Sequence, residues 1–293
     1  MGLLGVTLAA FLLPRDESSI QKRPLDVVGF AIIAPALSCI LYGLEQATHH
    51  KGGWVLLAGS ILLGVFIWHA IRMGSASLID MQLFRNRIFS AAAATQFCAN
   101  GLTFSRQFLV PLYLITGCAL SASTVGWMMA AMGFGMMCSF PMLGFLTERF
   151  GCRAVSAGGS FLALLGMCPF LWMIHGQVSL PAAVVCLFVT GAGQGTINIP
   201  SISAAYASVS RDRLAVANTA INIVQRLGGP LAVTIMAIVM SLSGTHASAF
   251  GPRTFMIAFL LLIGLNLLVL GAASRLPVLI HQQTGPKTQS LQE

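Results

Sequence analysis

Charged residues are scarce in this chain. Only 8% of its 293 residues are Asp, Glu, Lys or Arg, whereas soluble domains carry about 25%. Hydrophobic residues make up 56% of the sequence, and the mean hydropathy is +0.84. This composition excludes a soluble protein and predicts an integral membrane protein. Short segments of alternating polar and apolar residues, which are typical of a membrane β-barrel, are not found, so the predicted class is all-α.

Acidic residues are half as frequent as basic ones, 8 against 16. The chain has 8 Asp and Glu residues in total: Asp16, Glu17, Asp26, Glu45, Asp80, Glu148, Asp212 and Glu293. None of them lies deep within an apolar run. Proton-coupled transport needs a group that gains and loses a proton inside the membrane, usually Asp or Glu. The sequence therefore offers no coupling carboxylate of its own.

Motifs for catalysis, metals and cofactors are also missing. No catalytic triad, phosphate-binding Gly-rich loop or HExxH motif occurs. The 7 cysteines fall mostly inside apolar runs, without the spacing of a disulfide framework or a zinc site. The net charge of +8 is not gathered into one basic patch, which disfavours a nucleic-acid partner. We therefore expect no enzyme activity, no cofactor and no metal.

Long apolar runs dominate what is present. Eight runs are long enough to cross a hydrocarbon core of about 30 Å: 25–44, 54–71, 88–114, 125–146, 154–174, 180–206, 214–241 and 254–274. Met1–Leu13 is too short to cross and looks like the second half of a membrane helix. The sequence thus predicts a helical bundle of eight full spans plus one partial span.

The loops divide this bundle into segments. We expect a partial span over 1–13, a polar cytoplasmic linker over 14–24 and a pair of helices over 25–73. A six-helix domain over 88–275 and a polar tail over 276–293 would follow.

The basic residues predict the orientation. Of the 16 Lys and Arg, twelve fall in alternate loops that would share one side: Arg15, Lys22, Arg23, Arg72, Arg85, Arg87, Arg149, Arg153, Arg211, Arg213, Arg275 and Lys287. The opposite side holds Lys51 and Arg253. Positive charge accumulates on the cytoplasmic side of membrane proteins, so the linker and the C-terminal tail are predicted to be cytoplasmic.

Polar residues recur at helical spacing inside several spans. One stripe comprises Gln96, Asn100, Thr103 and Gln107; a second comprises Gln194 and Asn198; a third comprises Asn218, Asn222 and Arg226, with Gln225 beside it. Polar groups in hydrocarbon face either a partner helix or a cavity, and both alternatives stay open for the amides. The cation at Arg226 favours a functional or inter-domain role. Arg106 lies near the far end of a long span, where its side chain could snorkel to the interface.

The turn between two of the spans carries a specific motif. Gly144 to Arg153 reads GFLTERFGCR, with Gly144, Glu148, Arg149, Gly151 and Arg153 at the key positions. It resembles the inter-helix signature of the major facilitator superfamily, a gating-loop motif. Glu148 stands where that signature has Asp, and Cys152 replaces a basic residue.

Five further segments make the resemblance more specific. They match, in order, the fourteen-helix drug/proton antiporters of the EmrB/QacA type, as a C-terminal portion: Pro24–Asp26, LFRNRIF (83–89), VPLYL (110–114), GAGQGTINIP (191–200) and NIVQRLGGPLAV (222–233). Gly191 and Gly195 within the fourth segment are expected to serve close helix packing.

The resemblance implies a mechanism. Such transporters are two six-helix halves with the substrate bound between them, and the coupling acids belong to the half that this chain lacks. The implied function is efflux of small amphipathic organic compounds by proton antiport across a bacterial-type inner membrane. The partners would be the lipid bilayer, protons, the substrate and a separately encoded N-terminal half. The implied substrate-cavity residues are Gln96, Asn100, Gln107, Tyr113, Gln194, Asn198, Asn218, Asn222 and Arg226.

The same resemblance also predicts that this portion is inactive alone. The alternative is a non-transporting membrane subunit, or half of a split transporter, that works by association with a partner.

Overall fold

A computed structural model of the chain describes residues 26–46, 50–74, 80–174, 179–210, 213–243 and 251–277. Within these ranges the protein is helical, without a strand. The elements are α2 (Val27–Glu45), α3 (His50–Met73), η2 (Met81–Arg85), α4 (Arg87–Leu112), η3 (Tyr113–Gly117), α5 (Ala122–Met173), α6 (Leu180–Ala207), α7 (Leu214–Ser243) and α8 (Pro252–Ala273). The predicted all-α membrane bundle is confirmed.

The helix bounds agree with the predicted spans to within a few residues. The exception is α5, which runs through two predicted spans with non-helical backbone only at Gly151 (φ 80, ψ 162). This positive φ is strained for residues with a Cβ, so glycine suits the break between the two limbs of α5. With α5 counted as two limbs, eight helical limbs correspond to the eight predicted full spans. The predicted partial span and linker lie outside the described residues.

Five helices of the described segments are long and apolar enough to cross a membrane: α3, α5, α6, α7 and α8. In α2 the apolar stretch is shorter, over Val27–Gly43. The remaining long helix, α4, carries the predicted polar stripe, and its buried polar residues include Gln96 and Arg106. Its polarity is matched by its central position, because α4 packs against α6, α7 and α8.

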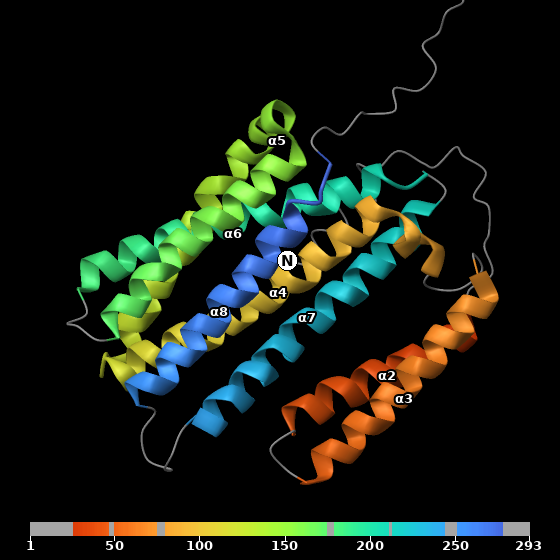
Figure 1. Cartoon of the computed structure of the whole chain (residues 1–293), viewed down its shortest axis with the longest axis horizontal. Helices are drawn as coiled ribbons and strands as arrows, with labels where there is room; N and C mark the ends of the chain where they lie inside the picture. The colour runs from red at the N-terminus through yellow and green to blue at the C-terminus, as the bar shows by residue number, and fades with distance from the viewer. Residues whose placement is uncertain are drawn as a thin grey trace, which may run out of the picture.

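The most extensive packing between helices is that of α5 with α6, which lie side by side in Figure 1. A Cβ on Gly191 would lie 1.9 Å from the carbonyl oxygen of Met132 in the first limb of α5. On the next face, a Cβ on Gly193 would lie 2.4 Å from the backbone of Ala163 in the second limb. A Cβ on Gly195, the second glycine of the GxxxG, would lie 3.0 Å from the carbonyl oxygen of Met136. Small residues let the backbones approach closely, so the packing role expected for Gly191 and Gly195 is confirmed.

Hydrogen bonds gather several loops at one end of the bundle. The Asn86 Nδ2 donates to the Ser208 carbonyl at 3.0 Å, and the Arg153 amide donates to the Pro277 carbonyl at 3.3 Å. An ion pair of 3.3 Å joins Arg213 to Asp80. The start of α4, the α6–α7 loop, the break in α5 and the end of α8 thus share one end, where predicted cytoplasmic arginines lie.

The helices α2 and α3 form a hairpin beside the bundle and contact it through α7 (Figure 1). The sequence places Asp26 within a first turn, but α2 begins one residue later. The Asp26 carboxylate instead accepts a hydrogen bond of 2.7 Å from the Gly29 amide, as an N-cap residue does. It also lies 3.2 Å from His69 Nε2 of α3, which ties the two helices together.

Candidate functional site

A buried polar seam runs between α4 and α6. At its centre Arg106 is 0% exposed, and its Nη1 donates to Oε1 of Gln194. The Gln194 Nε2 then donates to Thr103 Oγ1, which in turn donates to the Ala99 carbonyl at 2.7 Å. A guanidinium on one helix is thus held by an amide on its neighbour. The predicted snorkelling of Arg106 is wrong, because the side chain turns inward to Gln194.

A second layer of the seam lies two turns away along α4. The Gln96 Nε2 donates to the Asn198 carbonyl at 2.7 Å and to Ser201 Oγ at 2.6 Å. Both Gln96 and Ser201 are fully buried. Thr103 of the first layer and Gln96 of the second are seven positions apart on α4, so they fall on one face of the helix. For Gln96 and Gln194, the structure therefore shows interhelical hydrogen bonding.

The seam is not fully satisfied. Three buried atoms of the seam have no hydrogen-bond partner among the described residues: Gln96 Oε1, Arg106 Nε and Arg106 Nη2. No described ion pair involves Arg106, whose guanidinium thus keeps two donors unused in an apolar setting. Unpaired buried polar atoms are uncommon and costly, so this part of the seam is a candidate functional site.

An exposed polar stripe lies on α7, formed by Asn218, Asn222 and Arg226. Asn222 Nδ2 donates to the Asn218 side-chain oxygen at 2.8 Å, and Tyr206 of α6 donates to the same oxygen at 2.6 Å. Arg226 takes part in no ion pair with a described residue. The stripe therefore differs from the seam: Asn218 bonds to Asn222 and Tyr206, and Asn218, Asn222 and Arg226 are all exposed.

The other predicted cavity residues are spread out. Gln107 is exposed on α4, whereas Asn100 and Asn198 are half-buried. Tyr113 is only 3% exposed and packs edge-on against Phe255 and Phe259, with ring centroids 5.2 and 5.3 Å apart. The aromatic cluster around Tyr113 accounts for its burial by packing, so we do not carry it into the proposed pathway.

The gating-loop motif lies at the break in α5. Glu148, Arg149 and Arg153 are all exposed, and the Arg149 guanidinium lies over the rings of Phe145 and Phe150 at 5.8 and 5.6 Å. Gly144 is exposed too, and a Cβ there would meet nothing within 4 Å. Only Gly151 has a backbone requirement for its residue type.

Sequence reasoning missed two members of these groups, Ser201 and Tyr206. Ser201 lies at i+3 from Asn198 and i+7 from Gln194, so the helical spacing of α6 could have found it. Tyr206 lies a further turn along and reaches a different helix. No spacing within α6 would have indicated that contact.

Comparison with known proteins shows several bacterial relatives. The "Multidrug resistance protein B homolog" of Mycobacterium tuberculosis is 26% identical over 254 residues, covering 84% of this chain and 47% of that protein. The "Riboflavin transporter RibZ" of Clostridioides difficile is 26% identical over 255 residues, covering 85% and 52%. The "Lincomycin resistance protein LmrB" of Listeria innocua is 24% identical over 250 residues, covering 82% and 52%. The chain spans about half the length of the curated relatives it matches.

A family model decides the assignment. The model described as "Major Facilitator Superfamily" matches residues 1–233. These include the polar seam, the gating-loop motif and the part of α7 that carries the exposed stripe. The match agrees with the helical bundle, with the apolar spans and with relatives that are named as transporters or resistance proteins. This multi-pass membrane protein therefore belongs to the Major Facilitator Superfamily of transporters.

Proposed function

We propose that this chain supplies one half of a proton-driven efflux transporter for small amphipathic organic compounds. In this proposal α4, α6 and α7 form one wall of the substrate pathway, and a second six-helix half forms the other. The names of the relatives support the substrate class, since they include multidrug and lincomycin resistance proteins. Their length supports the two-half arrangement, because this chain spans about half of it.

The exposed stripe on α7 is the observation that carries the proposal. Arg226 lies near the middle of a 30-residue helix, with Asn222 one turn before it. An arginine at the centre of a membrane helix costs about 2.5–3.5 kcal/mol when it is inserted against lipid. Such a face is stable next to a water-filled cavity or another protein. We therefore place Asn218, Asn222 and Arg226 at the surface shared by the two halves.

In this proposal, the Arg106 guanidinium of the seam provides a fixed positive charge beside the substrate pathway. Arg106 keeps two unpaired donors, and a carboxylate or polar group of the substrate or of the other half would satisfy them. On the same helix the amide of Gln107 is exposed and that of Asn100 is partly exposed. This arrangement suits an amphipathic compound that presents an apolar body and a hydrogen-bonding end.

Proton coupling is assigned to the other half. All 8 carboxylates of the chain lie outside the deep parts of the predicted spans, so a proton-switching acid has to come from elsewhere. We place the transporter in a bacterial-type inner membrane. The one end of the bundle that carries Arg85, Arg153, Arg213 and Arg275 is then cytoplasmic, and so is the C-terminus.

Co-expression tests the proposal. The full chain would be produced in an efflux-deficient bacterium, alone and together with the N-terminal six-helix half of the M. tuberculosis relative. Proton-dependent efflux of a fluorescent amphipathic compound that carries a carboxylate would then be measured. We expect efflux only with both halves. Efflux by this chain alone in proteoliposomes would contradict the half-transporter proposal.

A spin label distinguishes transport from a purely structural role. Attached at Asn222→Cys in a cysteine-free background, it should be relaxed by a water-soluble nickel complex in the assembled transporter. Relaxation by oxygen alone would place the stripe against acyl chains and overturn the proposal. A stable complex of the two halves without efflux would indicate a non-transporting membrane subunit instead.

A further inference from the structure

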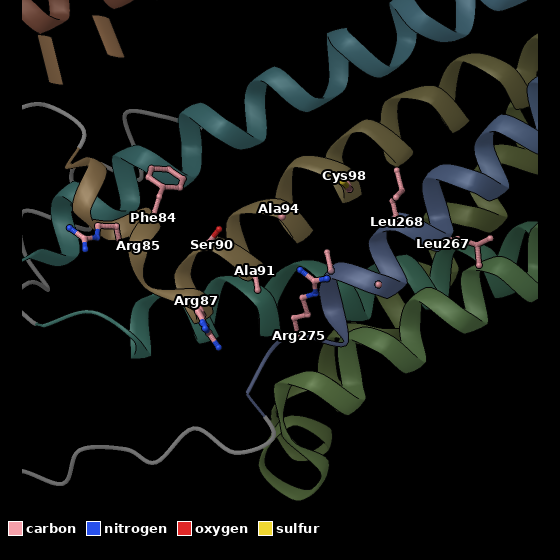
Figure 2. A pocket seen from close by; sticks show the side chains of 12 residues that line it. Phe84, Arg85, Arg87, Ser90, Ala91, Ala94, Cys98, Leu267, Leu268 and Arg275 are labelled. Carbon is pink, nitrogen blue, oxygen red and sulfur yellow. The ribbon is translucent and has the colours of Figure 1, made fainter. Parts of the chain in front are cut away.

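A groove opens on the bundle between the first half of α4 and the end of α8. Its volume is about 920 Å³, and its floor is made of small residues that include Ala94 of α4 and Gly271 of α8. Larger apolar side chains such as Leu268 border it. In Figure 2, Ala94 lies on α4 and Leu268 on the adjacent α8.

Three arginines line one end of the groove. Arg85 and Arg87 flank the start of α4, and Arg275 follows the end of α8 (Figure 2). All three are exposed, and none forms an ion pair with a described acidic residue. The opposite end, around Leu268, is apolar. The groove therefore joins a cationic end to an apolar trough.

This groove is distinct from the polar seam. Arg87, Ala94 and Cys98 of α4 line it, whereas Gln96 and Thr103 of the seam point to α6. At 100° per residue the groove positions are centred on the side of α4 opposite to the seam positions. A molecule in the groove would thus not lie in the proposed substrate pathway.

We propose that the groove binds an anionic phospholipid. The phosphate would lie against Arg85, Arg87 and Arg275, and one acyl chain would run along the trough toward Leu268. Basic clefts between membrane helices recognise anionic headgroups, and each arginine near such a surface contributes on the order of 1 kcal/mol. The lined face of α4 rises about 16 Å from Arg87 to Cys98, which is close to half of a hydrocarbon core of about 30 Å. The trough therefore matches the depth of one leaflet, and its charge matches the headgroup.

Titration of lipids onto the delipidated full chain, followed by native mass spectrometry, tests the proposal without reference to transport. Phosphatidylglycerol and phosphatidylcholine with identical acyl chains would be compared. We expect phosphatidylglycerol to bind at least about tenfold more tightly. Arg87→Gln and Arg275→Gln should each weaken its binding about fivefold, whereas Arg253→Gln, at the opposite end of α8, should leave it unchanged.

Two further variants separate headgroup from chain recognition. In Gly271→Leu the new side chain would occupy the trough without changing the charge, so it should weaken binding of phosphatidylglycerol. The helix can accept it, because a Cβ at Gly271 would meet nothing within 4 Å. Arg87→Lys and Arg275→Lys should bind phosphatidylglycerol with an affinity within about twofold of the wild type. If the Gln variants do not fold, the Lys variants, Gly271→Leu and the comparison of the two lipids on the wild-type chain test the proposal instead.

Equal binding of both lipids would overturn the proposal. So would an equal loss in Arg253→Gln. Displacement of phosphatidylglycerol by millimolar inorganic phosphate would identify the ligand as a free anion and not a lipid.

Discussion

Two arginines in membrane helices of this protein differ in burial and in hydrogen bonding. Arg106 of α4 is fully buried and donates to Gln194 of α6, whereas Arg226 of α7 is exposed with no ion pair to a described residue. Both belong to stretches in which amides and hydroxyls recur at helical spacing. Spacing therefore indicates that a helix has a polar face. Whether this face is covered depends on the complementary group that another helix brings to it.

The largest effect is expected when the buried arginine loses its acceptor. Gln194→Leu would leave the Arg106 guanidinium with no side-chain partner in an apolar interface, and we expect the free energy of unfolding to fall by about 3 kcal/mol. Steric trapping in bicelles would measure it. Gln107→Leu, an exposed amide on α4, is the matched control and should change it by less than about 0.5 kcal/mol.

A double variant tests the pairing itself. Arg106→Met combined with Gln194→Leu removes both polar groups, so it should be more stable than Gln194→Leu alone. If the losses of the two single variants simply add in the double variant, the two side chains do not interact and the seam is not held in this way.

A slightly smaller effect is expected where backbones approach most closely. Gly191→Ala places a methyl group 1.9 Å from the Met132 carbonyl oxygen, so α6 has to move away from α5. We expect a loss of about 1–3 kcal/mol in the free energy of unfolding. Gly144→Ala, whose Cβ meets nothing within 4 Å, should instead be neutral or stabilising by up to about 1 kcal/mol. The same sign for both variants would contradict the packing argument.

The sequence predicts the helices well because the spans have to be apolar and about 20 residues long, and their ends follow from that length. It also predicts the packing role of Gly191 and, through its motifs, the family that the superfamily match confirms. The sequence does not predict that Arg106 is buried, because its acceptor Gln194 lies 88 positions away in sequence. For Tyr113, which stays a predicted cavity residue, the sequence does not indicate the packing of its ring against Phe255 and Phe259. In both cases the deciding neighbour lies on another helix.

A modest effect is expected for the hydrogen bond that borders the exposed stripe. Tyr206→Phe removes the donor to Asn218 but leaves the acceptor accessible, so we expect a loss of about 0.5–1 kcal/mol in the free energy of unfolding. The contrast with Gln194→Leu sharpens the comparison, because one hydrogen bond is at the protein surface and the other is buried. A loss as large as that of Gln194→Leu would mean that the stripe is buried in the folded chain.

The smallest effect on stability is expected for Arg226, although its effect on function should be large. Arg226→Gln removes an exposed charge without a described ion pair, and the free energy of unfolding of the chain alone should stay within about 0.5 kcal/mol of the wild type. With the N-terminal half of the M. tuberculosis relative present, the same variant should lower efflux at least tenfold, while Arg226→Lys keeps part of it. Arg253→Gln, at an exposed arginine that lies at the start of α8 and not in the middle of a helix, should affect neither quantity. If Arg226→Gln weakens the isolated chain as strongly as Gln194→Leu does, then Arg226 stabilises this fold directly, and the α7 stripe is not the face that the second half covers.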